Sequence, residues 1–442
     1  MSARVRDLLP GLEAHRIEAI AQADATDIEA RVCRAFAAAL VGRTEEAARE
    51  AHAVQREAAA GQRGDLVCDA VSARALAAAN AADLDAATEL ARRASMMART
   101  EALRDQEVTA HLVLARVRRL TGRPFLATRI LSALQRYAPG DFAAWIDWEL
   151  VMAAGTTASL CPEGAAATFA AALAAARAGD ADGMAKALDV VTARMAGLSG
   201  QHSDVRSARA LLDGCDGGAQ LDPAVAAFRA GQRDEAPLGL LGLAAGPDSE
   251  ARVVVFVPEQ GRAMRLLALA APIAERSGAT RLRQSQRKQG RVDTVLAALA
   301  LAGAGLSEDA LFRATYGFAF SSNVHAGVLE VLLHRARAHL GDAAEIVRAS
   351  GTLALHPRRP LLLADPRCGG SAEDRILQLV ARQGHTTAKE ASRVLDVPLR
   401  SAQAALESLL GSGCCTRERN GRAIEYRVDD TTFREPTGVG GG

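Results

Sequence analysis

The amino-acid sequence predicts a mainly α-helical protein, in which an N-terminal array of helices is followed by two small domains that each carry a β-hairpin. Aromatic residues make up only 3% of the 442 residues and alanine is abundant, which favours closely packed helices over sheets. A short signature recurs at intervals of 40 residues in the first part of the chain. Towards the C-terminal end, Ser350-Gly351 and Asn420-Gly421 each separate two strand-like runs.

Residues 1–245 are expected to form the helical array. The signature is a small residue at the end of one helix and an alanine five positions later, which lets two helices approach closely. The small residues are Gly42, Ala82 and Gly122, and the alanines are Ala47, Ala87 and Ala127. Trp145 and Trp148 lie three residues apart, so they would share one face of a helix, where we expect them to pack in the core.

This pattern resembles that of tetratricopeptide repeats, in which a small turn residue and a following alanine recur in the same way. The resemblance implies stacked helical hairpins with a concave groove that receives a peptide or a partner protein. The interval of 40 residues is longer than the ~34 residues typical of that family. An ordinary alanine-rich helical bundle is the alternative for this region.

Residues 246–280 differ in character and are expected to link the array to the rest of the chain. The valine-rich run ARVVVFV at 251–257 predicts a strand. The run at 262–278 fits either a second strand or a helix that Pro272 interrupts, and we expect the helix.

Residues 281–366 are expected to form the first small domain. Its first helix carries apolar residues at helical spacing. These residues are Val292, Val295, Leu296 and Leu299. A second helix should close on Gly317, and a longer third helix should run from about Asn323 to Leu340. The run EIVRASGTLALHP at 345–357 predicts two strands around a tight turn.

This first domain resembles the DNA-binding domain of response regulators of the OmpR/PhoB type. Tyr316-Gly317 matches the aromatic–glycine step of that family, LLHRARAHLG at 332–341 matches the end of its recognition helix, and IVRASGTLAL matches its wing. The resemblance implies that the basic residues of these segments contact phosphates. They are Arg335, Arg337 and Arg348. The sequence departs from the family at Gly327-Val328 and at Gly351-Thr352-Leu353, which allows a second interpretation, a winged helix that contacts protein.

Residues 373–433 are expected to form the second small domain, with three short helices and a hairpin. Thr387 and Glu390 have the spacing of a capping box, Val394 should continue that second helix inward, and Pro398 should be the first residue of the third helix. The apolar stripe of the first helix is Ile376, Leu377, Leu379 and Val380, and that of the third is Ala402, Leu406 and Leu409.

This second domain resembles the winged helix-turn-helix domains of bacterial transcription regulators, broadly of the MarR-like kind. In such domains the start of the third helix meets base edges in the major groove of DNA. The resemblance therefore implies base contacts by Arg400, Ser401 and Gln403, which lie near that helix start and away from its apolar stripe.

The hairpin of the second domain is predicted from Asn420-Gly421, the strongest signal for a two-residue turn. This turn would pair Arg417 with Ile424 and place Arg419 opposite Arg422 at the tip. Like charges in that position repel each other. Arg417, Arg419 and Arg422 would then hold phosphates, although two solvated arginines without a function explain the tip equally well.

The charge balance excludes a protein that is basic throughout. Net charge is +1, so any surface for nucleic acid must be local. Residues 281–366 contain eleven Lys/Arg against seven Asp/Glu, whereas 371–435 contain ten of each. Affinity for DNA should therefore be modest unless the protein dimerises.

Motifs for catalysis, metals and membranes are not found in the sequence. It contains no P-loop, dinucleotide-binding glycine motif or HExxH, and its seven cysteines are never spaced as C-x-x-C. There is no apolar signal segment, and no apolar run approaches the ~18 residues that a membrane helix needs. We therefore expect a cytoplasmic protein that is not an enzyme and holds no cofactor, with a short joint at 364–372 and a disordered tail at 434–442.

These patterns together predict a DNA-binding transcription regulator. Double-stranded DNA would bind to the winged helices, and the array would bind a partner protein or mediate self-association, for instance as a homodimer. The alternative is a scaffold or adaptor without catalytic activity, in which both the repeats and the winged helices bind proteins.

Overall fold

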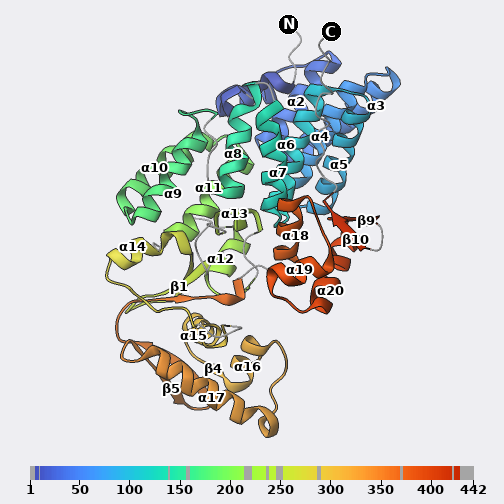
Figure 1. Ribbon diagram of the computed structural model, residues 1–442. Coiled ribbons are helices and arrows are strands. Elements are labelled where there is room, and N and C mark those ends of the chain that lie inside the picture. The colour runs from blue at the N-terminus through green and yellow to red at the C-terminus, as the bar shows by residue number, and fades with distance from the viewer. Residues whose placement is uncertain are drawn as a thin grey trace, which may run out of the picture. The chain divides into compact units, whose positions relative to one another are not determined.

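The computed structural model describes residues 5–8, 10–137, 140–155, 160–213, 222–234, 238–244, 252–285, 290–368, 372–420 and 423–428. The chain divides into two compact units, which are described separately. The first contains Met1–Ala167, Arg194–Gly200 and Gly370–Gly442, and the second contains Thr168–Ala193 and Gln201–Gly369. As predicted, the protein is mainly helical, with an N-terminal helical array and small sheets towards the C-terminal end (Figure 1).

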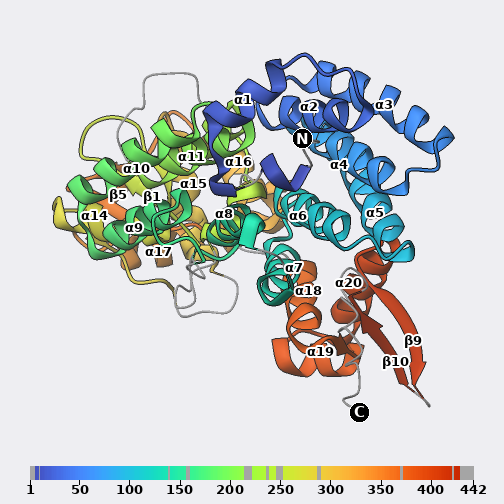
Figure 2. The ribbon, with the colours of Figure 1, turned by 90° about the horizontal axis from the view of Figure 1, so that it is seen from above.

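The helices of the array follow one another in antiparallel hairpins, and they lie side by side when seen from above (Figure 2). Three short 3-10 helices accompany them: η1 (Val5–Leu8), η2 (Pro10–Leu12) and η3 (Gly140–Phe142). The array consists of α1 (Ala14–Gln22), α2 (Ile28–Leu40), α3 (Thr44–Ala60), α4 (Gly64–Asn80), α5 (Leu84–Thr100), α6 (Arg104–Leu120), α7 (Pro124–Tyr137) and α8 (Ala143–Ala154).

The turns between these helices repeat every 20 residues, half the interval of the sequence signature. Each turn holds one residue in the left-handed conformation, with φ between 55° and 88°. These residues are Gly42, Gln62, Ala82, Ala102 and Gly122. The next amide N–H donates back to a carbonyl of the preceding helix, as Arg43 does to Ala38 at 2.8 Å and Arg63 does to Ala58 at 2.9 Å. This is the hydrogen bond of a Schellman motif, which ends a helix sharply.

The helices form an inner and an outer layer, which explains why the signature occurs only in every second turn. The signature alanines Ala47, Ala87 and Ala127 are fully buried and belong to the outer helices α3, α5 and α7. The inner helices α2, α4 and α6 contact each other as well as their neighbours in sequence. They begin differently, and the equivalent positions are Val67 and Glu107. The prediction of a helical array is confirmed, and the two tryptophans are buried in its core.

A buried ion cluster joins α6 to α8. The carboxylate of Glu149 accepts hydrogen bonds from Arg116 Nη1 and Arg119 Nε, both at 2.8 Å, and all three side chains are at most 2% exposed. Trp145 Nε1 donates to the same carboxylate at 3.4 Å. Charges taken out of water need partners at hydrogen-bond distance, so the cluster constrains the relative position of the two helices.

The second unit begins with helices and continues as a four-stranded sheet. The helices are α9 (Ala165–Ala178), α10 (Ala181–Met195), α11 (Ser199–Leu212), α12 (Pro223–Arg229), the 3-10 helix η4 (Leu238–Leu240) and α13 (Leu241–Ala244). The sheet has the order β2-β1-β7-β3 and contains β1 (Val253–Val257), β2 (Met264–Leu267), β3 (Thr280–Arg281) and β7 (Leu361–Ala364). The strand predicted from ARVVVFV is thus confirmed.

The prediction of a helix over 262–278 is wrong for the first part of this range. Residues 264–267 form β2, paired antiparallel to β1, and only then follow the 3-10 helix η5 (Ala268–Ala270) and α14 (Ala271–Arg276), with Pro272 in its first turn. The physical reason lies partly in Arg265, which is fully buried and donates through Nε to Asp365 at 2.9 Å and through Nη1 to the carbonyl of Phe228 at 3.2 Å. These long-range partners hold the strand, and no local pattern reveals them.

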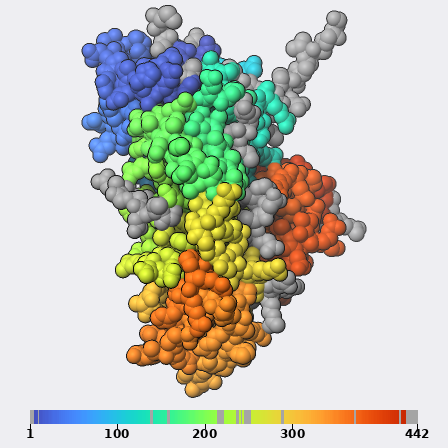
Figure 3. Space-filling view, turned by 90° about the vertical axis from the view of Figure 1, so that its left-hand side faces the viewer, coloured from blue at the N-terminus to red at the C-terminus, as the bar shows by residue number. Residues whose placement is uncertain are grey.

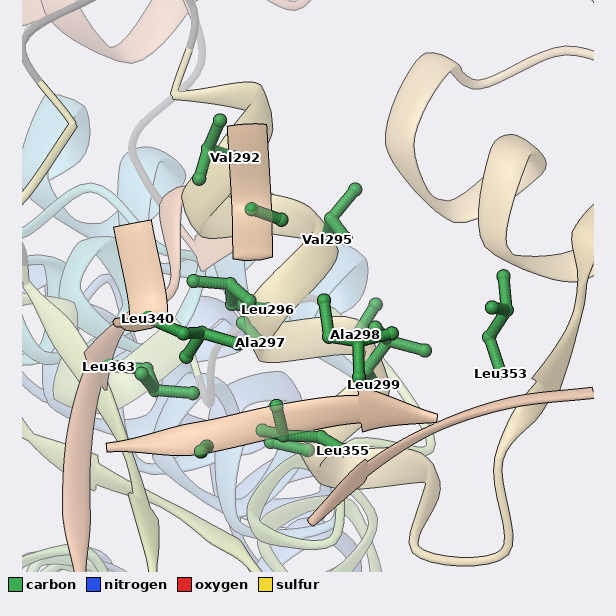
Figure 4. Packing of buried hydrophobic residues seen from close by; sticks show 14 of the residues in the cluster. Val292, Val295, Leu296, Ala297, Ala298, Leu299, Leu340, Leu353, Leu355 and Leu363 are labelled. Carbon is green, nitrogen blue, oxygen red and sulfur yellow. The ribbon is translucent and has the colours of Figure 1, made fainter. Parts of the chain in front are cut away.

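The first small domain is built around α15. Its three helices and its hairpin follow the predicted order, and the short strand β4 was not predicted. Its elements are α15 (Arg291–Ala302), β4 (Leu306–Ser307), α16 (Glu308–Tyr316), α17 (Ser322–Leu340), β5 (Ala344–Ala349) and β6 (Thr352–Pro357), and the 3-10 helix η6 (Pro366–Cys368) follows β7. The buried side of α15 lies over the hairpin, and Figure 4 shows Leu299 above the strand that carries Leu355. In the space-filling view these residues, in light to dark orange, form one continuous lobe (Figure 3).

The local signals in this domain are confirmed. The hydroxyl of Ser307 accepts the amide of Ala310 at the start of α16, which ends on Gly317 with a φ of 79°. The hairpin turns at Ser350 and Gly351, which have φ of 49° and 78°, values that suit a type I′ turn.

The second small domain belongs to the first unit. It consists of α18 (Ala372–Gln383), β8 (His385–Thr386), α19 (Ala388–Leu395), α20 (Leu399–Gly411), β9 (Thr416–Asn420) and β10 (Ala423–Arg427). The three helices and the hairpin are confirmed, and α20 starts one residue later than expected, after Pro398 as its N-cap. Val394, expected to be buried, is 48% exposed, because the short helix α19 fully buries only Ala391.

The predicted register of the last hairpin is wrong by two residues. Asn420 pairs with Ala423 and Arg419 pairs with Ile424, so Arg419 and Arg422 are not opposite each other. Gly421 and Arg422 lie outside the described residues. The sequence satisfies two turn rules at once, because Asn-Gly suits a type I′ turn while glycine followed by any residue suits a type II′ turn. A shift of two residues keeps every side chain on its face of the hairpin.

The ion cluster of the array yields a first prediction. Replacing Glu149 with alanine should lower the free energy of unfolding by about 3–5 kcal/mol, because two buried guanidinium groups lose a carboxylate partner. The two tryptophans of the chain both lie in the array, so their fluorescence during urea unfolding reports on this unit. Glu46→Ala, which removes an exposed pair with Arg43 in the same unit, is the control and should change stability by no more than ~0.5 kcal/mol.

A second prediction concerns Asp69 on α4, whose buried carboxyl accepts a hydrogen bond from Gln106 Nε2 at 3.2 Å. Burial, followed by the charges of Asp65 and Asp105, raises the pKa of Asp69 to about 7. The unfolded chain releases this proton at about pH 4. The contribution of this protonated carboxyl to the free energy of unfolding is therefore fully present below about pH 4 and is lost as the pH rises towards 7.

Asp69→Asn should remove this loss, because the amide has no proton to release and its oxygen can still accept the hydrogen bond. The free energy of unfolding of the unsubstituted protein should fall relative to that of the variant by about 1 kcal/mol per pH unit between pH 5 and 7. Urea unfolding at several pH values, again followed by tryptophan fluorescence, measures the difference. Parallel pH profiles for the two proteins would contradict the prediction.

Candidate nucleic-acid interface

Both small domains have the same topology. Each runs helix, strand, helix, helix, strand, strand: α15-β4-α16-α17-β5-β6 in the first and α18-β8-α19-α20-β9-β10 in the second. In both sheets the last strand lies in the middle, with orders β4-β6-β5 and β8-β10-β9. In each domain the three helices are thus followed by a hairpin, as expected from the sequence, and the third helix and the hairpin are the candidate parts for contact with a nucleic acid.

The second domain is anchored on the helical array within the first unit. Its core of α18, α19, α20 and β10 also includes Leu126, and Phe125 packs against it. Arg129 Nη1 on α7 donates to the carbonyl of Ala381 at the end of α18, at 3.1 Å. Figures 1 and 2 both show α18 beside α7. The side that faces α7 is therefore covered, and α20 and the hairpin remain exposed.

The turn between α19 and α20 is fixed by local hydrogen bonds. Thr387 caps α19 by accepting the amide of Glu390 at 3.2 Å, as its spacing predicts. At the other end Asp396 adopts the left-handed conformation, and Ser392 Oγ donates to the carbonyl of Val397 at 2.7 Å. These hydrogen bonds set the direction in which α20 leaves the turn.

The predicted base-reading residues are all exposed on the first turns of α20. The buried side of this helix is formed by Ala402, Ala405, Leu406 and Leu409. Since successive residues of a helix are about 100° apart, Arg400 lies opposite this buried side, and Ser401 and Gln403 lie on its two flanks. The helix thus presents a guanidinium, a hydroxyl and a carboxamide across its outer half, groups that bind base edges.

The hairpin brings two of the predicted phosphate-binding residues to the same side. Arg417 is opposite Tyr426 and Arg419 is opposite Ile424, so these four side chains share one face. Tyr426 is buried, and its hydroxyl donates to Glu407 Oε1 on α20 at 2.9 Å. Arg417 Nη1 lies 3.8 Å from the same oxygen. The face that carries the two arginines therefore turns towards α20.

The interaction with Glu407 has two electrostatic consequences. Burial, followed by this hydrogen bond, raises the pKa of Tyr426, so the phenol stays neutral and keeps its proton to donate. Arg417 is partly neutralised by the carboxylate, whereas Arg419 has no ion-pair partner among the described residues. Of these two arginines of the hairpin, Arg419 therefore has the less compensated charge. Arg422 lies outside the described residues.

The sequence reasoning missed two exposed cations on α19, Lys389 and Arg393. Both lie on the opposite side of the helix from the buried Ala391. Their spacing of two positions on either side of Ala391 was the signal that could have found them. It also missed Glu407, whose negative charge lies on the outer half of α20. Only the hydrogen bond to Tyr426 explains its position, and that interaction is long-range.

The predicted basic residues of the first domain are arranged less favourably. Arg335 and Arg337 are exposed on α17 and form no ion pair within the described part of the chain. They are two positions apart, about 200° around the helix, so they point to opposite sides. Arg348 on β5 pairs with Glu308 at 3.1 Å and also with Glu330, and these two carboxylates compensate its charge.

Metal-binding clusters and membrane-spanning helices are absent from the part of the chain that the structure describes. No group of three or more His, Cys, Asp or Glu side chains could hold a metal ion there. No helix of the described chain is both long and apolar enough to cross a membrane.

Comparison with known proteins found no similarity: no protein-family model matches the chain, and neither a curated protein nor a solved structure does so.

Proposed function

We propose that the protein is a DNA-binding transcription regulator and that its second small domain is a winged helix that binds DNA. The observation that carries the proposal is the convergence of α20 and the wing. Arg400, Ser401 and Gln403 are exposed on the outer half of the helix, and the wing face with Arg417 and Arg419 turns towards it. Helix and wing together then form one surface, on which the helix reads bases and the wing holds phosphates.

The helical array has a different role in this proposal. A stacked array of this kind, resembling tetratricopeptide repeats, offers an extended surface to a peptide or partner protein and has no catalytic pocket by construction. Because the second winged helix packs on α7 within the same unit, a partner bound to the array would be carried to the DNA. The first winged helix contributes Arg335 and Arg337 as phosphate contacts only if α17 approaches DNA.

An adaptor without DNA binding is the second candidate. It is favoured by the near-neutral charge of the chain and by the apolar residues exposed on α17. Binding of the full-length protein to labelled duplex DNA over a salt series distinguishes the two. Under the DNA-binding proposal log Kd rises linearly with log salt, whereas absence of binding at low salt favours the adaptor.

The wing gives the third prediction. Arg417→Ala combined with Arg419→Ala should weaken binding to every duplex sequence and should flatten the salt dependence, because up to two phosphates are no longer neutralised. The matched control is Arg358→Ala with Arg359→Ala, which removes the same charge from the end of the β5–β6 hairpin opposite its tip. If the slope of log Kd against log salt concentration were the same for the wing double variant and the unsubstituted protein, the wing would not be part of the interface.

The recognition helix gives the fourth prediction, which differs in kind. Arg400→Ala and Gln403→Ala should each reduce discrimination between the preferred site and a random duplex, by about 1–3 kcal/mol for each base that the variant no longer reads. Sites are first selected from a random library, and competition binding then compares site and random duplex at one salt concentration. If affinity fell equally for the selected site and the random duplex, so that their ratio stayed unchanged, these side chains would contact the DNA backbone and not the bases.

A further inference from the structure

Helix α17 has two apolar sides, and only one of them is used by its own domain. Leu329, Leu332, Leu333, Ala336 and Leu340 are buried in the core. On another side lie Val324, Gly327, Val328 and Val331, called here the α17 stripe. The three valines are 69%, 47% and 51% exposed. Their spacing of four, three and seven residues places them on one face of the helix, and such contiguous exposed apolar surface marks a site of association.

The start of the stripe is held rigidly by an aromatic cluster. Phe312 on α16 stacks on Tyr316 at 4.4 Å and on His325 at 4.6 Å between ring centroids. Phe318, in the turn before α17, packs edge-on against Phe312 at 5.4 Å and is itself 51% exposed. The helix is thus fixed in place before anything binds, which lowers the entropy lost on association.

The stripe is symmetric about the point midway between Gly327 and Val328. We propose that it pairs with the same stripe of a second copy of the chain, the two helices running antiparallel around a two-fold axis. In this register Val324 meets the partner's Val331, and Val328 meets the partner's Gly327. The space beside Gly327 is open, because a Cβ built there meets nothing within 4 Å. A valine from the second copy can fill that space, as a self-complementary interface requires.

The charges around the stripe suit the same pairing. The stripe itself carries no charge, and the nearest cation on its face is Arg335. The two copies of Arg335 would be ~22 Å apart at 1.5 Å per residue, beyond the ~8–10 Å over which charges act at physiological salt. Each would lie opposite the partner's Phe320, whose amide donates to Asp309 at 3.3 Å. Arg335 therefore comes near the partner's Asp309, which is half exposed and already pairs with Arg313 at 3.0 Å, so no two uncompensated like charges meet in this register.

This pairing concerns the first small domain and does not depend on DNA binding. It accounts for the departure at Gly327-Val328, because a helix that reads DNA needs hydrogen-bond donors and acceptors there. The interface is small for a protein dimer, so a weak dimer in the micromolar range is expected.

Sedimentation of the full-length protein over a concentration series tests the proposal. The protein should be a reversible dimer, and Val328→Asp should weaken dimerisation at least about tenfold, since a charge would be buried in a dry interface. Val190→Asp is the matched control, since Val190 is equally exposed, at 48%, but lies on α10. Circular dichroism verifies that both variants are folded. A monomer up to about 100 μM, or a dimer that Val328→Asp leaves unchanged, would overturn the proposal.

Single cysteine variants test the register. Under mild oxidation Gly327→Cys should form a disulfide-linked dimer, because the two copies of this position meet at the axis. Val324→Cys should not, since its copies are ~10 Å apart along the axis and a disulfide spans less than ~7 Å between Cα atoms. A mixture of Val324→Cys and Val331→Cys chains should cross-link, and the unsubstituted protein controls for the native cysteines. Cross-linking of Val324→Cys alone would refute the antiparallel register.

Discussion

The constraint on which most of the structure depends is the turn that closes each helix of the array. It is made of one left-handed residue and one hydrogen bond back into the helix, and it recurs every 20 residues from Gly42 to Gly122. Three of the five left-handed residues are not glycine, and each costs about 1 kcal/mol of backbone strain. Alanines on the outer helices let neighbouring helices pack closely along their whole length, and this packing offsets the strain of the turns. Helix α7 follows the last of these turns, and the second small domain packs on it through Leu126.

The two small domains illustrate how one topology supports different chemistry. Both have the same order of elements and the same strand order, yet the third helix is polar at its start in one and apolar along its exposed side in the other. The core residues that define the fold point inward in both. The outer half of the third helix is therefore free to vary, and it decides what the domain binds.

Much of the fold could be predicted from local signals. Thr387 caps its helix as expected, Gly317 ends α16, and the Ser350-Gly351 hairpin lies where its turn residues predict it. Prediction failed where two local rules compete or where the partner is distant. The register at Asn420 is compatible with two turn types, and β2 depends on Arg265 bonded to Asp365, 100 residues away.

In the candidate interface, too, the features set by local signals could be predicted and those set by distant partners could not. Exposure of Arg400, Ser401 and Gln403 follows from the apolar stripe of α20, which the sequence displays. The direction of the wing depends on the hydrogen bond between Tyr426 and Glu407, and the anchoring of the domain depends on Leu126. Neither interaction leaves a periodic trace in the sequence.

The packing of α18 on α7 has a consequence for the order of events during synthesis. The surface around Phe125 and Leu126 is complete as soon as the array has folded, but the residues that cover it, such as Ile376, follow about 250 positions later. At ribosomal rates of about 5–20 residues per second, this surface waits on the order of 10–50 s for its cover. During that interval the nascent chain exposes an apolar face that the finished protein hides.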